Sequence, residues 1–196
     1  VGLLSSDGRF KRLPLDEFKE LSGRAASVLK LKDGVTLQRV VTCRDGEELV
    51  VASSTGRLIR LAVNEANLPI MGRNAQGPVL LRLLPGEAVV GAAGATEEGS
   101  VLLATAMGQL KRLAVASLRR CQRGDLGQIG LRFQERGDQV VDLCATNTRL
   151  VSAQMSTGRS LRLVTADLQT EDDSGSSQRL GMRGEEMLRE LLPLFS

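Results

Sequence analysis

Arginine is the residue with the most evident chemical potential in this chain of 196 residues. Only five of its 26 Lys and Arg residues are Lys. The guanidinium fork of Arg binds a phosphate through two hydrogen bonds, whereas the Lys ammonium acts as a point charge. Residues 1–164 carry 23 basic and 16 acidic side chains, and residues 165–196 carry 3 and 7. This distribution indicates a polyanionic partner for the larger part of the chain.

The basic residues recur at a fixed spacing. An apolar strand, a Ser/Thr turn, a glycine and a basic strand ending in Arg-Leu occur together four times, at Val1–Leu13, Leu49–Leu61, Val101–Leu113 and Ser152–Leu163. The glycines of this pattern, here called marker glycines, are 48, 52 and 50 residues apart: Gly8, Gly56, Gly108 and Gly158. A second turn follows in the first three copies, at Asp33-Gly34, Pro85-Gly86 and Arg136-Gly137-Asp138. Two landmarks thus keep one period of about 50 residues.

The repeat predicts an all-β, propeller-like fold. Gly supplies the positive φ of a tight turn between apolar and β-branched strands, so each copy holds two hairpins and about four strands. Such a sheet cannot bury its apolar face alone and must stack on its neighbours. We expect one repeat domain of about four four-stranded blades, with units at 1–48, 49–100, 101–150 and 151–196. Leu15–Leu21 could be helical; Gly184–Phe195 is interpreted as containing a strand, because LRELLP echoes the earlier LLRLLPG.

Two segments carry a resemblance to a known family. Val101–Leu118 and Met71–Val89 resemble the blade repeat in the C-terminal domain of the A subunits of DNA gyrase and topoisomerase IV. The resemblance covers nearly the whole chain and implies a β-pinwheel, a disc whose blades share strands and whose basic rim wraps duplex DNA. The gyrase members carry a box, QRRGGKG, and the local match here is QRLGMRG at Gln178–Gly184, which lacks one Arg and one Gly. Gyrase and topoisomerase IV both stay open.

The resemblance also implies a biological setting. The chain would be a non-catalytic domain of a type IIA topoisomerase that supports supercoiling by presenting DNA to the cleavage core. Its partners would be double-stranded DNA, the ATPase B subunit of the enzyme and the remainder of its A subunit. The setting would be the bacterial cytoplasm, at the nucleoid.

Three sets of basic residues are candidates for DNA contact. The first stands four residues after each marker glycine and would either contact phosphate or pair across units: Arg12, Arg60, Arg112 and Arg162. The second is expected on the opposite, more open strand face: Arg9, Lys11, Arg57, Lys111 and Arg159. The third lies in or beside the segments between the two hairpins of each unit, here called interhairpin segments: Arg24, Arg73, Arg119, Arg120, Arg123, Arg179 and Arg183. For the last two sets the alternative is ordinary solvated charge.

The expected mode of binding is backbone contact with duplex DNA. Phosphate contacts give affinity and salt dependence with little sequence preference. The only aromatic residues are four Phe, which makes base stacking on a single strand a poor alternative. A basic surface would equally serve a propeller-like module that binds an acidic protein partner.

Catalysis, cofactors and metals are not expected. The chain has no His and no Tyr, and it lacks the GxxxxGK[ST] loop of ATP-binding proteins. An enzyme with an unrecognised carboxylate site is the competing hypothesis. The acidic residues Glu171, Asp172 and Asp173 are interpreted as a loop that competes with DNA for the basic residues. The odd count of three cysteines favours a reducing compartment, and no apolar run is long enough to span a membrane.

Overall fold

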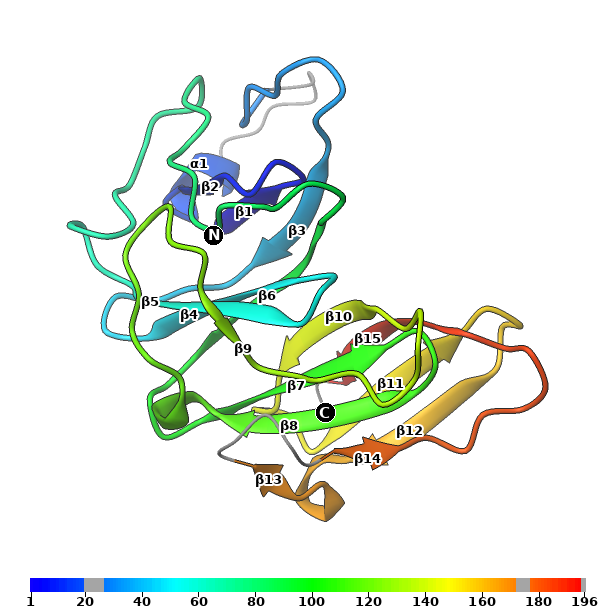
Figure 1. The fold of residues 1–196 in the computed structure, drawn as a ribbon. Helices are drawn as coiled ribbons and strands as arrows, with labels where there is room; N and C mark the ends of the chain where they lie inside the picture. Colours follow the sequence, from blue (N-terminus) through cyan, green and yellow to red (C-terminus); the bar gives the residue numbers. More distant parts are fainter. Residues whose placement is uncertain (20–26, 172–176, 195–196) are drawn as a thin grey trace.

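The computed structural model describes residues 1–19, 27–171 and 177–194, and this part of the chain is almost entirely β. Each unit contributes three main strands. They are β1 (Gly2–Ser5), β2 (Phe10–Arg12) and β3 (Leu37–Val41); β4 (Glu48–Ser53), β5 (Arg57–Ala62) and β6 (Val89–Ala95); β7 (Ser100–Thr105), β8 (Gln109–Ala114) and β10 (Val140–Ala145); and β11 (Leu150–Met155), β12 (Ser160–Val164) and β15 (Leu188–Leu194). Figure 1 shows the four sheets following one another in chain order. The all-β prediction is confirmed.

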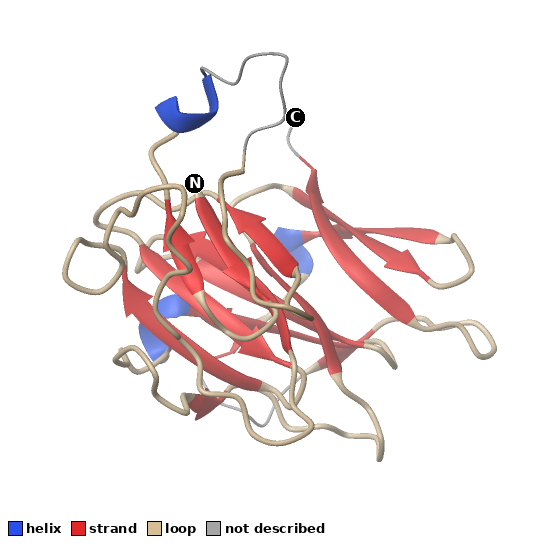
Figure 2. Ribbon diagram, turned by 90° about the horizontal axis from the view of Figure 1, so that it is seen from above, coloured by secondary structure: helices blue, strands red, loops and turns tan. Residues whose placement is uncertain are grey.

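Short elements connect these strands. They are the helix α1 (Asp16–Lys19), the 3-10 turns η1 (Val115–Ser117) and η2 (Thr165–Asp167), and the two-residue strands β9 (Gln128–Ile129), β13 (Thr170–Glu171) and β14 (Gln178–Arg179). Figure 2 shows how little of the molecule is helical. The expected helix at Leu15–Leu21 is a single turn in its described part, and the strand expected near the C-terminus is β15.

The predicted turns have the positive φ at glycine that the sequence pattern implies. The four marker glycines have φ between +80° and +87°, which any residue with a Cβ adopts at a cost. Gly34, Gly86 and Gly137 of the second turns have φ of +76°, +78° and +83°. The first landmark is therefore a hairpin turn, as the sequence predicts, because its flanking strands pair with each other. The second landmark is a tight turn but not the predicted hairpin: in the second unit the segment before it bridges to the first sheet at Val79, whereas β6 after it pairs with β4.

Neighbouring units exchange outer strands. The order β6-β4-β5-β9 places β9 of the third unit on the outer edge of the second sheet, and β13 and β14 of the fourth unit pair with β8 of the third. In the first sheet this edge is occupied by bridges from Arg9 to Val79 and from Arg12 to Ile70. Each of these blades thus combines residues of two units, whereas the sheet β12-β11-β15 has three strands.

The hydrophobic core lies between successive sheets. Side chains of β4 alternate, so Val51 packs with Leu4 and Phe10 of the first unit while Val50 packs with Leu103 and Val115 of the third. A further cluster joins the third and fourth units, with Leu102, Leu110, Val151 and Leu188 among its members. Both faces of the middle sheets are buried, which explains their continuous apolar runs.

The innermost strands of the four units pack in the order β3, β6, β10, β15. They line a cavity of about 200 Å³, and Arg39, Cys144 and Asn147 are among its lining residues. All three cysteines are free, with Cys121 and Cys144 buried and Cys43 half-buried. No helix in residues 1–19, 27–171 and 177–194 has the length and apolar character to cross a membrane.

Candidate nucleic-acid interface

The arginines four residues after the marker glycines tie one unit to the next. Arg60, which is 3% exposed, donates from Nη1 to the carbonyl oxygens of Val115 and Leu118, both at 2.9 Å, at the turn η1 of the following unit. Its Nε donates to Glu48 at 2.9 Å and its Nη2 to Glu97 at 2.7 Å. All three guanidinium nitrogens donate hydrogen bonds, and those from Nη1 link the second unit to the third.

The same contact recurs on either side of Arg60. Arg12 is buried and donates from Nε to the Leu68 carbonyl of the second unit. Arg112 donates from Nη1 to the carbonyls of Thr165 and Leu168, at 2.9 and 3.1 Å, at the turn η2 of the fourth unit. Arg162 has no such partner in the described part of the chain and is exposed. The structure therefore favours the architectural alternative for Arg12, Arg60 and Arg112, and leaves only Arg162 of this set free for a ligand.

The expectation of an open face for the second set needs correction. Lys11 and Lys111 are each 1% exposed, so the strand face that carries them is covered rather than open. Lys11 donates to the carbonyls of Val28 and Arg73, at 2.7 and 2.6 Å. These two lysines, with Arg12 and Arg60, are too deeply buried to meet a phosphate backbone.

The arginines directly after the marker glycines are engaged in contacts within the fold. Arg57 pairs with Glu87, and Arg159 pairs with Glu186; both carboxylates are 1% exposed, and each glutamate lies at the second turn of its own unit. Arg9 donates to the Gly77 carbonyl at 2.9 Å and lies 3.3 Å from Asp7. These half-buried arginines are thus held by the fold.

The pKa of Glu87 shows that its ion pair with Arg57 persists at physiological pH. Burial alone would raise the pKa of Glu87, but hydrogen bonds from Arg57, the Leu84 N–H, Ser53 and Thr55 lower it to about 2. The carboxylate is therefore charged at any physiological pH and keeps Arg57 engaged.

Among the predicted residues, most of those open to a ligand lie in the interhairpin segments. Arg119, Arg123 and Arg183 are exposed, and their side chains contact no acid or carbonyl in the described residues. Arg73, Arg120 and Arg179 are about half exposed, and each pairs with a surface glutamate of the preceding unit. Arg24 lies outside the described residues, as do Asp172 and Asp173. Of the three predicted sets, the third therefore supplies most of the exposed residues.

The interhairpin arginines are not equivalent by position, contrary to the expectation from the sequence pattern. The N–H groups of Met71 and Cys121 bond to the carbonyls of Arg12 and Arg60, so Arg73 and Arg123 occupy matching places. Arg179 instead lies opposite Gln109 on β14, the place that Ile129 takes opposite Arg57. Loop length differs between units, so the sequence pattern aligns residues that the fold places differently.

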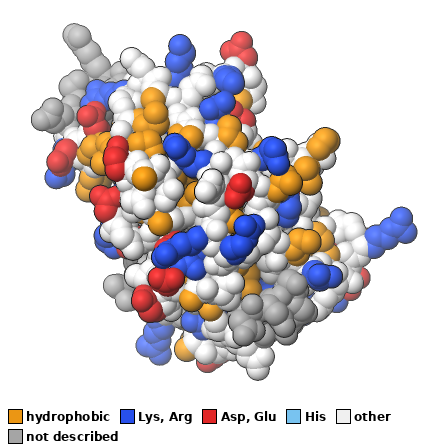
Figure 3. Space-filling view, turned by 60° about the vertical axis from the view of Figure 1, so that its left-hand side comes forward, with side chains coloured by type: hydrophobic (Ala, Val, Ile, Leu, Met, Phe, Trp, Pro, Cys, Tyr) orange, Lys and Arg blue, Asp and Glu red, His pale blue; other side chains and the backbone are white. Residues whose placement is uncertain are grey.

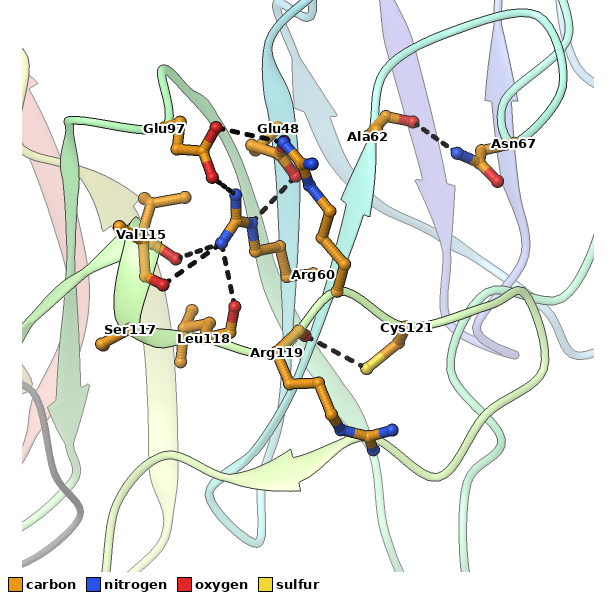
Figure 4. A network of polar contacts seen from close by, with 12 residues as sticks. Glu48, Arg60, Ala62, Asn67, Glu97, Val115, Ser117, Leu118, Arg119 and Cys121 are labelled. Atoms are coloured by element: carbon orange, nitrogen blue, oxygen red, sulfur yellow. Dashed lines mark hydrogen bonds and ion pairs between the residues drawn. The ribbon is translucent and has the colours of Figure 1, made fainter.

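The surface is a mixture of charges. Figure 3 shows blue Lys and Arg side chains dispersed over one face, with red Asp and Glu beside several of them. Figure 4 shows the centre of one such group, where Glu48, Arg60 and Glu97 converge while the Arg119 side chain points away from them. Some arginines, such as Arg119, thus point away from carboxylates that bind a neighbouring arginine, as Glu48 and Glu97 bind Arg60.

Two charged residues on the innermost strands were not predicted from the sequence. Asp142 of β10 has no exposed surface, pairs with Arg39 of β3, and accepts the N–H groups of Leu143 and Leu191 at 2.7 and 2.8 Å. Burial raises the pKa of Asp142 to about 6, against the opposing effects of Arg39 and the two N–H groups. The signal was present: Asp142 is a lone acid within the run VVDLC, five residues after the turn glycine.

Stacked sheets that exchange outer strands and expose arginine-bearing segments along that outer edge define a propeller-like repeat domain with an arginine-rich surface. The chain belongs to the DNA gyrase C-terminal domain family, a beta-propeller, whose model matches residues 3–44, 47–93 and 99–144.

Individual relatives agree with this family. The chain is 36% identical over 164 residues to the A subunit of DNA topoisomerase 4 from Synechocystis, covering 79% of this chain and 18% of the relative. It is 31% identical over 141 residues to the A subunit of DNA gyrase from Escherichia coli, covering 72% and 16%. A solved DNA gyrase A C-terminal domain has the same fold, with a TM-score of 0.85 at 18% identity, covering 99% of this chain and 65% of that one. The chain therefore spans less than a fifth of the first two relatives.

Proposed function

We propose that this chain binds duplex DNA through its phosphates, without sequence preference, and wraps it as a non-catalytic domain of a bacterial type II topoisomerase. The observation that carries the proposal is the set of exposed arginines on the interhairpin segments of a chain that belongs to this family. Its partners would then be the ATP-hydrolysing B subunit of the enzyme and the remainder of its A subunit, with the nucleoid as its location.

The contact surface we propose is smaller than the set of basic residues in the sequence. Arg119, Arg123 and Arg183 are exposed and uncommitted in the described part of the chain, and Arg73, Arg120 and Arg179 lie beside them in the same segments. These residues come from three successive units, so a duplex following the outer edge meets them in turn. Guanidinium groups spaced along an edge suit a regular array of phosphates and read no base.

The test compares two double variants with the same loss of charge. Arg119→Ala with Arg123→Ala removes two interhairpin arginines, and Arg149→Ala with Arg189→Ala removes two exposed arginines from a turn between units and from β15. Binding to random-sequence duplexes is measured by fluorescence anisotropy over a range of salt concentrations.

The proposal requires that the wild type bind these duplexes with equal affinity for different sequences. The first variant should flatten the slope of log K against log salt by about 0.9 for each lost phosphate contact, and the second should leave it unchanged. Absence of duplex binding by the wild type would refute the function. Equal effects of the two variants would refute the surface assignment, and binding only to an acidic protein would favour a protein-interaction module.

A further inference from the structure

Three interhairpin arginines are paired across unit boundaries with glutamates on the surface. Arg73 Nε lies 2.7 Å from Glu17, Arg120 Nη2 lies 3.2 Å from Glu97, and Arg179 Nη1 lies 2.8 Å from Glu135. In each case the arginine belongs to one unit and the glutamate to the unit before it. The pairs thus lie at all three boundaries between the four units, on the segments that we propose to contact DNA.

These pairs are more exposed than the Arg57–Glu87 and Arg159–Glu186 pairs. All six side chains are 40 to 55% exposed, whereas Glu87 and Glu186 are 1% exposed. An exposed ion pair contributes little, about 0–1 kcal/mol, because water and salt screen it. A phosphate can replace the carboxylate on such an arginine at small cost, and it offers the same two-oxygen geometry.

The Arg120 pair shows how the exchange would leave the protein intact. Buried Glu48 accepts from Arg120 Nε at 3.0 Å and from Nη2 at 2.5 Å, so it holds the guanidinium in place from the inner side. Glu97 contacts the same Nη2 from the solvent side, and its other oxygen accepts from Arg60. Figure 4 shows Glu97 to the left of Glu48, with both carboxylates directed toward Arg60. Removing the Glu97 charge would therefore free Arg120 for a phosphate without releasing it from Glu48.

We propose that Glu17, Glu97 and Glu135 restrain DNA binding by occupying the arginines that would otherwise hold phosphates. This inference rests on the proposed function and assigns regulation to the same surface. Each phosphate that binds at a unit boundary displaces one glutamate, so the acids lower the affinity for DNA.

The test uses two adjacent glutamates in the full chain. Glu97→Gln removes a paired carboxylate, and Glu98→Gln removes the same charge from an exposed residue that forms no ion pair with the described residues. Affinity for a random-sequence duplex is measured for both variants by fluorescence anisotropy over a salt series, and thermal unfolding checks that both remain folded.

The expected result is that E97Q binds the duplex about two- to fivefold more tightly than E98Q, the gain that one exposed ion pair allows. Its salt slope should equal that of E98Q, because both proteins make the same phosphate contact and differ only in the carboxylate that the phosphate must displace. In an Arg120→Ala background the two variants should become equal. Equal affinities of E97Q and E98Q in the presence of Arg120 would overturn the inference while leaving DNA binding in place. A wild type that does not bind duplexes would overturn both.

Should Glu97→Gln disturb the buried Arg60, a second site keeps the comparison decisive. Glu135→Gln frees Arg179 at the boundary between the third and fourth units, where neither partner is buried. Its matched control is Glu185→Gln, an exposed glutamate of the fourth unit that forms no ion pair in the described chain. E135Q should again bind more tightly than its control, and equality would count against the inference.

Discussion

At the scale of single residues, the same sequence position has different surroundings in successive units. Arg60 and Arg162 both stand four residues after a marker glycine and before Leu. Arg60 is buried and donates to carbonyls of the next unit, while Arg162 is exposed on β12. What an arginine does here depends on whether another unit packs against it.

Replacing each of these arginines by Ala should separate the two environments. Arg60→Ala leaves buried Glu48 with Arg120 as its sole cationic partner in the described chain and removes the bonds to Val115 and Leu118. We expect a loss of ~3–5 kcal/mol in the free energy of unfolding, as when one partner of a buried ion pair is removed. Arg162→Ala should cost less than about 0.5 kcal/mol. Urea denaturation followed by circular dichroism measures both, and similar losses would show that Arg60 does not hold the units together.

Asp142 gives the stability of the molecule a dependence on pH. Its pKa is raised from 3.8 to about 6, so the native state holds the proton more tightly than the unfolded chain. Its contribution to the free energy of unfolding is thus full below about pH 4, is lost as the pH rises to about 6, and stays lost above that. Arg39 and the nearby Glu190 are the other charged groups acting on it.

The Asp142→Asn variant isolates this contribution. Between pH 4 and pH 6 the wild type should lose on the order of 2–3 kcal/mol relative to D142N, because the amide does not titrate. The measurement is the difference in unfolding free energy between the two proteins at pH 4, 5, 6 and 7. The difference should be constant above pH 6.5, and a constant difference over the whole range would contradict the raised pKa.

At the scale of elements, the exchange of outer strands determines how closely units approach. The marker glycine Gly56 has a carbonyl of the next unit against it: a Cβ built there would lie 2.6 Å from the Leu131 oxygen. A Cβ on Gly158 would meet nothing within 4 Å, although its φ of +84° is nearly that of Gly56 at +82°. The same turn is therefore crowded in one unit and open in another.

Alanine substitutions at these two glycines should measure the contact between elements. Gly158→Ala carries the backbone strain alone, about 1–2 kcal/mol. Gly56→Ala carries the same strain and must also displace the segment at Leu131, which should cost ~1–3 kcal/mol more. Thermal or urea unfolding of the two variants gives the comparison. Equal destabilisation would mean that the segment yields freely and that strand exchange adds little to stability.

The sequence predicts hairpins well because their determinants are local. A glycine with positive φ between alternating apolar runs is sufficient to mark Gly8, Gly56, Gly108 and Gly158 as turns. The burial of Lys11 and Lys111 was not predictable in this way, because strand alternation separates an inner from an outer face only when one face meets water. Once neighbouring sheets or interhairpin segments cover the second face, both faces are interior, as for Lys11 beneath Val28 and Arg73. The partner of each arginine is then decided by another unit, as for Arg60 and Val115.

At the scale of the whole molecule, wrapping requires contacts from several units at once. Bending 20–30 base pairs of duplex by 40–90° costs ~1–6 kcal/mol, which is more than one exposed arginine supplies. The arginines proposed to contact DNA are distributed over the second, third and fourth units, along the outer edge of the array. A duplex that contacts all of them must curve with the array, so binding and bending are coupled in this proposal.

Wrapping should therefore appear as a change in DNA linking number. Relaxed nicked circles are ligated in the presence of increasing amounts of the chain, and the products are separated on gels that resolve topoisomers. We expect a change in linking number that grows with the amount of protein, as wrapping of the duplex around the array implies. The variant with Arg119→Ala and Arg123→Ala should give a smaller shift at equal occupancy, because the duplex loses its hold on the third unit and the bend is no longer sustained. Full occupancy with no change in linking number would mean that the chain attaches to DNA without wrapping it.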